Sequence, residues 1–191
     1  MSIFEFVLVM ASLILAIGIT VLLRHVALII TNRRTIELDF VAISWMVFLF
    51  IIATSMWWSF WDYSNVNWTY PLYMYLLMCP TLQFLAISML VSTDTSKPGA
   101  SLSATFKRVR LPFMILMAAF QVIVSWDGWV FGVEPFWNGL RAIQCTVILI
   151  FVIGALTSKQ IVQKILVTAI LSIEIIGTFL LRYLPGAYGA S

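Results

Sequence analysis

Long apolar runs separated by short polar stretches dominate the hydrophobic pattern of this chain. A helix rises about 1.5 Å per residue and a bilayer core is about 30 Å thick, so about 20 apolar residues cross it. The runs are too long and unbroken for the alternating strands of a membrane barrel. The pattern therefore predicts an all-α membrane protein, a bundle of six transmembrane helices with short loops, at approximately 3–30, 40–61, 70–91, 111–126, 136–156 and 165–184.

The polar stretches are too short to form a soluble domain. The longest, residues 92–109, is rich in Ser, Lys, Gly and Pro, a composition typical of a loop. Charged residues make up 10% of the chain and hydrophobic residues 62%, whereas a soluble domain has about 25% charged residues. The first run contains Glu5 but no basic start or small-residue cleavage site, so we expect a retained helix. Residues 1–191 should form one integral membrane domain.

Basic residues occupy alternate connections, which predicts the orientation of the chain. They are Arg33 and Arg34 in the first connection, Lys97, Lys107, Arg108 and Arg110 in the third, and Lys159 and Lys164 in the fifth. Cytoplasmic loops are enriched in Lys and Arg, so both termini should lie on the outer side.

In overall type the layout resembles small multi-pass proteins of bacterial inner (plasma) membranes, which implies that location. No residue motif matches a family of known function.

Tryptophan is concentrated toward the predicted outer side, with Trp45 as the exception among eight. One interpretation is an interfacial belt, because the amphipathic ring suits the headgroup region. The other is an outer-face aromatic surface that lines a pocket or contacts a partner. The candidates for that surface are Trp61, Trp68, Trp126, Trp129 and Trp137.

A weak parallel hairpin repeat is a further possibility. A Trp-Asp pair ends the second run and another ends the fourth, each followed by a proline (Pro71, Pro135) and a cysteine (Cys79, Cys145). Pro71 and Pro135 should open helices, where a missing N–H is harmless. Pro80 lies inside the third run and should kink that helix. Both cysteines should be free thiols that behave as small hydrophobes.

Polar side chains inside the apolar runs are the best pointers to function, because each needs a partner or water. Four of them lie about 8–14 Å below the outer ends by helical rise: Gln121, Arg141, Gln144 and Glu174. One interpretation is a buried ion pair between Arg141 and Glu174, supported by the two glutamines. Others are a polar cavity or ion path that uses Glu174, and a contact with a partner subunit.

A second charged group gathers at the inner face: Arg24, His25, Arg34 and Asp39. The arginines can extend their charged ends to the lipid headgroups. Asp39 stands in the first turn of a helix, where the helix dipole favours an acid. A proton-sensing role for His25 is an alternative, because its ordinary pKa lies in the physiological range.

Missing motifs restrict the chemistry. The chain has a single histidine and no Cys-x-x-Cys, so we expect no haem, metal site or other cofactor. Catalytic and nucleotide-binding motifs are absent, so we expect no enzyme, and the net charge of +3 reflects membrane loops rather than nucleic-acid binding. The sequence favours a structural or accessory subunit that assembles with itself or another membrane complex. The alternative is a small channel or transporter with a polar pathway in the outer half of the bilayer.

Overall fold

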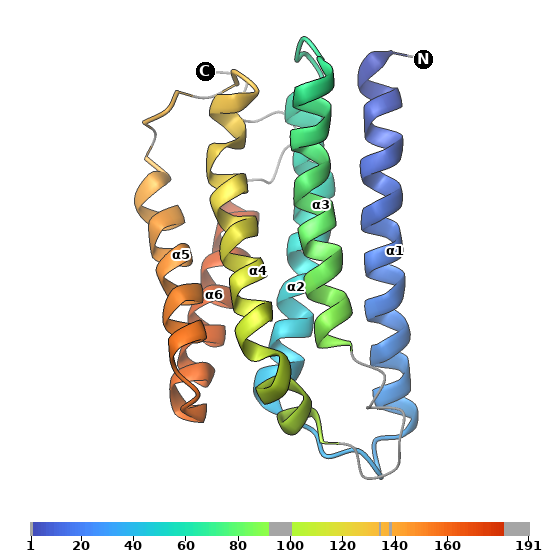
Figure 1. The fold of residues 1–191 in the computed structure, drawn as a ribbon, viewed down its shortest axis with the longest axis vertical. Coiled ribbons are helices and arrows are strands. Elements are labelled where there is room, and N and C mark those ends of the chain that lie inside the picture. The colour runs from blue at the N-terminus through green and yellow to red at the C-terminus, as the bar shows by residue number, and fades with distance from the viewer. Residues whose placement is uncertain (1, 92–100, 134, 138, 182–191) are drawn as a thin grey trace.

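The protein is seen in a computed structural model that describes residues 2–91, 101–133, 135–137 and 139–181 (Figure 1). These residues form six α-helices and one 3-10 turn, with no β-strand among them, as the all-α prediction required. The elements are α1 (Ile3–Thr31), α2 (Phe40–Ser59), η1 (Phe60–Tyr63), α3 (Tyr70–Leu90), α4 (Leu102–Val130), α5 (Arg141–Leu156) and α6 (Gln160–Leu181).

The helices form two layers. Figure 1 shows α1, α3, α4 and α5 in one row, with α2 and α6 behind it. Within the row α3 packs between α1 and α4, and α4 packs against α5, while α2 packs mainly against α6. The chain runs up and down, so the α1–α2 and α5–α6 connections, the end of α3 and the start of α4 lie at one end, the lower one in Figure 1.

We call that end the basic end, because its described basic residues are Arg33, Arg34, Lys107, Arg108, Arg110, Lys159 and Lys164. The opposite end, with the α2–α3 and α4–α5 connections, is the aromatic end. Lys97 lies outside the described residues. The grouping of basic residues at one end, on which the predicted orientation depends, is therefore present in the fold.

Five helices are long and apolar enough to cross a membrane, and α5 is a shorter apolar helix. The chain is thus a helical bundle of membrane-spanning character. Four predicted boundaries are wrong by four residues or more: both ends of α4, the start of α5, and the start of α6, which is Gln160 rather than residue 165. α4 begins at Leu102 rather than near residue 111, with the Ser101 side chain accepting a hydrogen bond from the Ala104 N–H. Lys and Arg residues interrupt a hydrophobic run, but both have a high helix propensity. The helix therefore extends beyond the hydrophobic segment.

The start of α5 is a further boundary error. The helix begins at Arg141 rather than at residue 136, so Pro135 does not open it. The chain leaves α4 through Gly132, whose φ of +72° suits a residue without Cβ. α5 has 16 residues, a length of about 24 Å. By contrast, Pro71 does stand in the first turn of α3, and Pro80 lies inside it.

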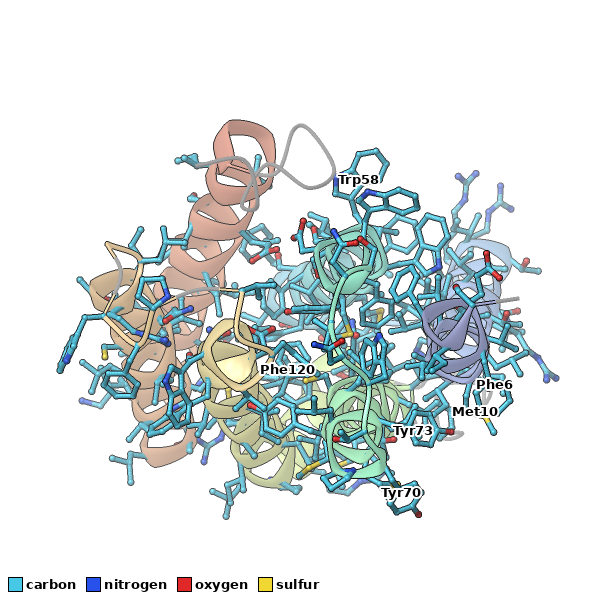
Figure 2. The ribbon with its side chains drawn as sticks, turned by 90° about the horizontal axis from the view of Figure 1, so that it is seen from above. Phe6, Met10, Trp58, Tyr70, Tyr73 and Phe120 are labelled. Atoms are coloured by element: carbon cyan, nitrogen blue, oxygen red, sulfur yellow. The ribbon has the colours of Figure 1, made fainter. Side chains whose placement is uncertain are left out.

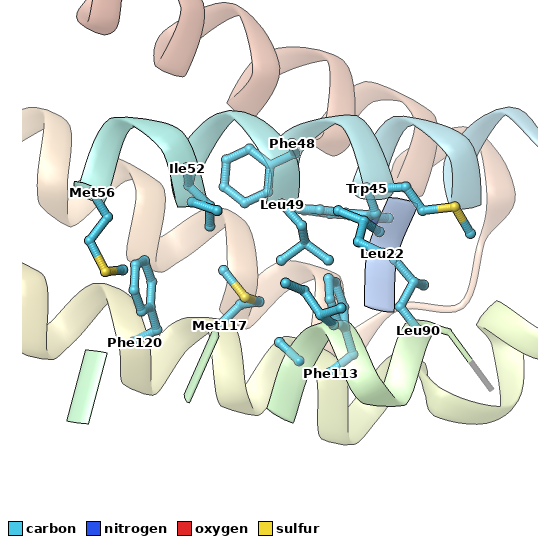
Figure 3. Packing of buried hydrophobic residues seen from close by; sticks show 14 of the residues in the cluster. Leu22, Trp45, Phe48, Leu49, Ile52, Met56, Leu90, Phe113, Met117 and Phe120 are labelled. Atoms are coloured by element: carbon cyan, nitrogen blue, oxygen red, sulfur yellow. The ribbon is translucent and has the colours of Figure 1, made fainter. Parts of the chain in front are cut away.

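All six helices contribute side chains to the buried hydrophobic core, and part of it lies between α2 and α4. Figure 3 shows Trp45, Leu49 and Ile52 on α2 facing Phe113 and Met117 on α4. Trp45 and Phe113 are fully buried, with ring centroids 5.3 Å apart. Two glycines allow close helix contacts. A Cβ on Gly18 would lie 3.3 Å from Ile87 on α3, and one on Gly154 would lie 2.9 Å from the Met114 sulfur.

The packing of the helices gives no further support to the repeat that the sequence pattern suggested. The two hairpins of that repeat would be α2–α3 and α4–α5. α4 packs closely along α5, whereas α2 packs more against α6 than against α3. The repeat stays a prediction.

Candidate binding cavity

A partly open cavity of about 620 Å³ lies between the two layers, toward the aromatic end. Its wall includes α2 from Phe48 onward, η1, α4 from Phe120 onward, the start of α5 and the α6 segment that ends at Gly177, with Leu76 and Cys79 of α3. Pockets of 300–1,000 Å³ are typical of small-molecule sites. The size and position therefore make this cavity the candidate functional site.

Small side chains leave this space unfilled. Ser55 and Ser59 on α2, Ala142 on α5 and Gly177 on α6 all line the cavity. Nearer the basic end, Trp45 fills the same interlayer space. The layers therefore meet tightly in one half of the bundle and stand apart in the other.

Three of the four residues of the predicted polar cluster line the cavity. Gln121 comes from α4, Gln144 from α5 and Glu174 from α6. The structure places these three side chains together on the wall of one cavity. The polar or hydroxyl-bearing residues of the whole wall are Ser55, Ser59, Tyr63, Gln121, Asp127, Gln144, Thr146 and Glu174.

Arg141, the fourth residue of that cluster, is held at the start of its own helix. Its Nε donates to the Phe136 carbonyl at 2.7 Å and its Nη1 to Gln144 Oε1 at 2.9 Å. The guanidinium lies 5.5 Å from the centroid of the Phe136 ring, a cation–π distance. Among the described residues, the hydrogen bonds of Arg141 go to these two groups and not to Glu174. The contacts also fix Gln144 on the cavity wall.

Asp127 belongs to the cavity although the sequence pattern placed it in a loop. It accepts hydrogen bonds from the Tyr63 hydroxyl at 2.8 Å and from the Gly128 N–H at 2.6 Å. The prediction missed it because α4 was expected to end at residue 126. A usable signal was present, since Phe120, Val124 and Asp127 recur at helical spacing on one face.

The floor of the cavity is aromatic. Phe48 lines the cavity, and its ring centroid lies 5.5 Å from that of Trp45 and 6.2 Å from that of Phe151. Trp45 and Phe151 are fully buried. These two rings therefore pack next to Phe48, the α2 wall residue nearest the basic end.

The predicted aromatic surface divides into separate parts. Trp126, Trp129 and Trp137 surround Phe136, with centroids 5.3–5.8 Å from it, and all three are exposed. Trp68 is half-buried and packs 5.5 Å from Phe131 instead. The exposed aromatic side chains of this end also point to different sides, since Trp58 and Tyr70 lie on opposite edges in Figure 2. This distribution around the bundle fits an interfacial belt better than one contact surface.

The inner-face charged group is also divided. His25 is buried on the packed face of α1, whereas Arg24 and Arg34 are exposed. Asp39 caps α2 by accepting the Ala42 N–H at 2.9 Å, and its other oxygen accepts from Gln160 Nε2 at 3.3 Å. Asp39 therefore joins α2 to α6, a structural role that explains its burial.

Other chemistry in the bundle is sparse. Within the described ranges, no three His, Cys, Asp or Glu side chains are grouped to hold a metal ion. Cys79 and Cys145 are free thiols, as predicted. Cys79 is buried on the cavity wall and Cys145 is exposed on α5.

Comparison with known protein families, with curated proteins and with solved structures finds no match to this chain.

Proposed function

We propose that the chain is a non-enzymatic membrane protein that binds a small solute in this cavity, as a small transporter does. The observation that carries the proposal is the 620 Å³ cavity, walled by Gln121, Gln144 and Glu174. Each of these groups is costly in lipid unless it meets a partner or water. A wet cavity that receives a ligand accounts for their convergence from three helices.

The aromatic floor favours a carrier over a channel. The buried rings of Trp45 and Phe151 pack against Phe48, on the side of the wall that faces the basic end. A carrier exposes its site to one side at a time, near the middle of the bilayer. The conformation described here would then be the one that is accessible from the aromatic end.

The proposal includes an orientation and a location. With the basic end in the cytoplasm, the positive-inside rule places both termini on the outer side. The cavity would then face the periplasm or exterior of a bacterial inner membrane. The lipid bilayer is the surrounding partner in this proposal.

A structural or accessory subunit is the second candidate, favoured by the short α5. Its length of about 24 Å falls short of a hydrocarbon core of about 30 Å. Association with another helix is one way to accommodate such a mismatch. In this case α5 would contact a second copy or another membrane subunit.

Cysteine labelling on α4 separates the two candidates. Val124 lines the cavity, whereas Val122, two residues away, is 44% exposed and is not part of the wall. Val124→Cys and Val122→Cys are made separately with Cys79→Ala and Cys145→Ala, and are treated in membranes with water-soluble methanethiosulfonate reagents.

We expect the Val124→Cys variant to react and the Val122→Cys variant to remain unreacted, because only the cavity admits water. Equal protection of both positions would mean a dry interior and would favour the subunit assignment. Labelling of Val122→Cys alone would contradict the cavity altogether.

A further inference from the structure

The polarity of the cavity wall changes along the bundle. On each of four helices, the wall residue nearest the basic end is apolar: Phe48 on α2, Phe120 on α4, Val147 on α5 and Ile170 on α6. Every polar wall residue of these helices lies nearer the aromatic end than the apolar one of its own helix. A molecule that matches this order has an apolar part in the middle of the bundle and a polar part at the aromatic end.

The depth of the cavity matches one leaflet of a bilayer. Along α2 the wall runs from Phe48 to Ser59, a rise of about 16 Å at about 1.5 Å per residue. A hydrocarbon core is about 30 Å thick, so one leaflet contributes about 15 Å. An acyl chain of the leaflet at the aromatic end would therefore fit the cavity along its length.

α5 and α6 provide a route into the cavity from that leaflet. At the basic end Gln163 of α6 joins the two helices, since its Nε2 donates to the Gly154 carbonyl at 2.9 Å and to the Thr157 carbonyl at 2.8 Å. Toward the aromatic end the two helices diverge (Figures 1 and 2). Ile143 of α5 and Ile176 of α6 line the cavity and are 45% and 56% exposed. This exposure places two apolar side chains at the rim, one on each of the diverging helices.

We propose that the cavity binds a membrane phospholipid, with one acyl chain inserted between the two layers and the headgroup at the aromatic end. This inference rests on the proposed binding function and adds the chemical class of the solute. Water gains little from the apolar floor, whereas an acyl chain makes dispersion contacts with it. The polar wall residues nearer the aromatic end stay within reach of the headgroup and of water.

Two photoactivatable phosphatidylcholines test the depth and the direction of the bound lipid. One carries a diazirine at the end of an acyl chain, and the other carries it beside the ester of the same chain. The intact protein is irradiated in nanodiscs that contain one probe, and the labelled residues are identified by mass spectrometry. We expect the chain-end probe to label Phe48, Phe120 and Val147. The ester probe should label Phe60 and Phe131, which line the wall nearer the aromatic end.

Burial separates this labelling from contact with lipid outside the bundle. All five target side chains are at most 7% exposed, so lipid on the outer surface does not reach them. Phe113 is buried on the same helix as Phe120 but is not part of the described wall. It should stay unlabelled by both probes. Label on Ile115 of α4, which is 55% exposed, reports the surrounding bilayer.

A pair of tryptophan variants blocks the site. Val124→Trp adds a large ring to the cavity wall, whereas Val122→Trp makes the same change on the exposed side of α4. We expect Val124→Trp to reduce chain-end labelling of Phe120 about tenfold, because the ring takes the volume of the chain. Val122→Trp should leave that labelling unchanged, and both variants should leave the label on Ile115 unchanged. Thermal unfolding checks that both are folded, and the pattern of the two probes on the native protein needs no variant.

The outcomes distinguish this inference from the function it rests on. Label confined to exposed residues overturns the lipid assignment, and solute binding still stands if a methanethiosulfonate labels Val124→Cys. Chain-end label at Phe60 with ester label at Phe48 would reverse the direction of the lipid and also overturn the inference. Label on Phe113, or labelling of Phe120 that survives Val124→Trp, would show that the probe reaches the core without the cavity. If neither probe reaches the wall and Val124→Cys is not labelled, the proposed function itself is wrong.

Discussion

At the scale of single residues, Arg110 shows how a charged side chain can hold two helices of the bundle together. Its Nη1 lies 2.6, 2.7 and 2.6 Å from the carbonyl oxygens of Gly154, Ala155 and Thr157. The last carbonyls of a helix lack partners within the helix and carry partial negative charge. Arg110 of α4 therefore caps the end of α5 and connects the two helices at the basic end.

We expect Arg110→Met to lower the free energy of unfolding by about 2–3 kcal/mol, because hydrogen bonds from a charged group are lost. Lys107→Met, on the exposed side of the same turn, should change it by less than about 0.5 kcal/mol. Unfolding in mixed detergent with increasing denaturant measures both. Similar losses of unfolding free energy for the two variants would mean that the positive charge, and not its hydrogen bonds to the carbonyls of α5, stabilises the protein.

A methyl group added at Gly154 tests the α4–α5 contact. Its Cβ would lie 2.9 Å from the sulfur and 3.1 Å from the terminal carbon of Met114. Since these atoms end a flexible side chain, Gly154→Ala should cost about 1 kcal/mol and Gly154→Leu about 3 kcal/mol. Gly177→Ala, with nothing within 4 Å, is the control.

Combining Gly154→Ala with Met114→Ala should cost less than the sum of the two single losses, because the shortened side chain no longer meets the added Cβ. A double-mutant cycle by thermal unfolding measures this coupling. Strictly additive effects would contradict the contact.

At the scale of elements, α1 shows how a helix joins the bundle by one narrow seam. Its buried residues recur at intervals of three and four: Val7, Ala11, Leu15, Gly18, Leu22, His25 and Ile29. This is the spacing of a coiled-coil seam. Large residues such as Phe6, Leu13 and Ile17 remain exposed on the other faces, as expected for a helix that contacts lipid.

Gly18→Leu should destabilise the bundle by about 1–3 kcal/mol, because the larger side chain would separate α1 from Phe84 and Ile87 of α3. Ala16→Leu introduces the same side chain on an exposed position of α1 and should be close to neutral. Thermal unfolding of the two variants in one detergent makes the comparison. A greater loss from Ala16→Leu would place the seam elsewhere.

At the scale of the whole molecule, the two ends and the two halves of the bundle differ. Basic residues gather at one end and exposed aromatic residues at the other. The layers are tightly packed around Trp45 and Phe113 but separate around the cavity. In the proposed function, the orientation of the bundle decides which side of the membrane reaches the cavity.

Cysteine accessibility at the two ends tests the orientation. In a background with Cys79→Ala and Cys145→Ala, Asn65→Cys marks the aromatic end and Arg33→Cys the basic end. We expect an impermeant maleimide to label Asn65→Cys in intact spheroplasts, and Arg33→Cys only after permeabilisation, because basic connections stay in the cytoplasm. The reverse pattern would invert the proposed topology and turn the cavity toward the cytoplasm.

The polar cluster shows how far the sequence alone could go with the site. Gln121, Gln144 and Glu174 were identifiable because an uncompensated polar group in lipid is expensive wherever it occurs. The contact of Arg141 with Gln144 follows from helical spacing, but its contact with Phe136 was not predictable, because Phe136 lies in a segment that was expected to be helical. Asp127 was missed for a related reason, since the end of α4 depends on the turn at Gly132.

The sequence by itself determined the helical membrane class, the approximate spans and the basic and aromatic ends. These follow from local rules, because each segment in lipid must satisfy its own backbone hydrogen bonds and be apolar over its length. Only the tertiary structure decided which helices are neighbours, how α5 is capped and where the cavity lies. Most of these helices are apolar on every side, so lipid and protein interior favour similar side chains and the pattern does not reveal the packed face.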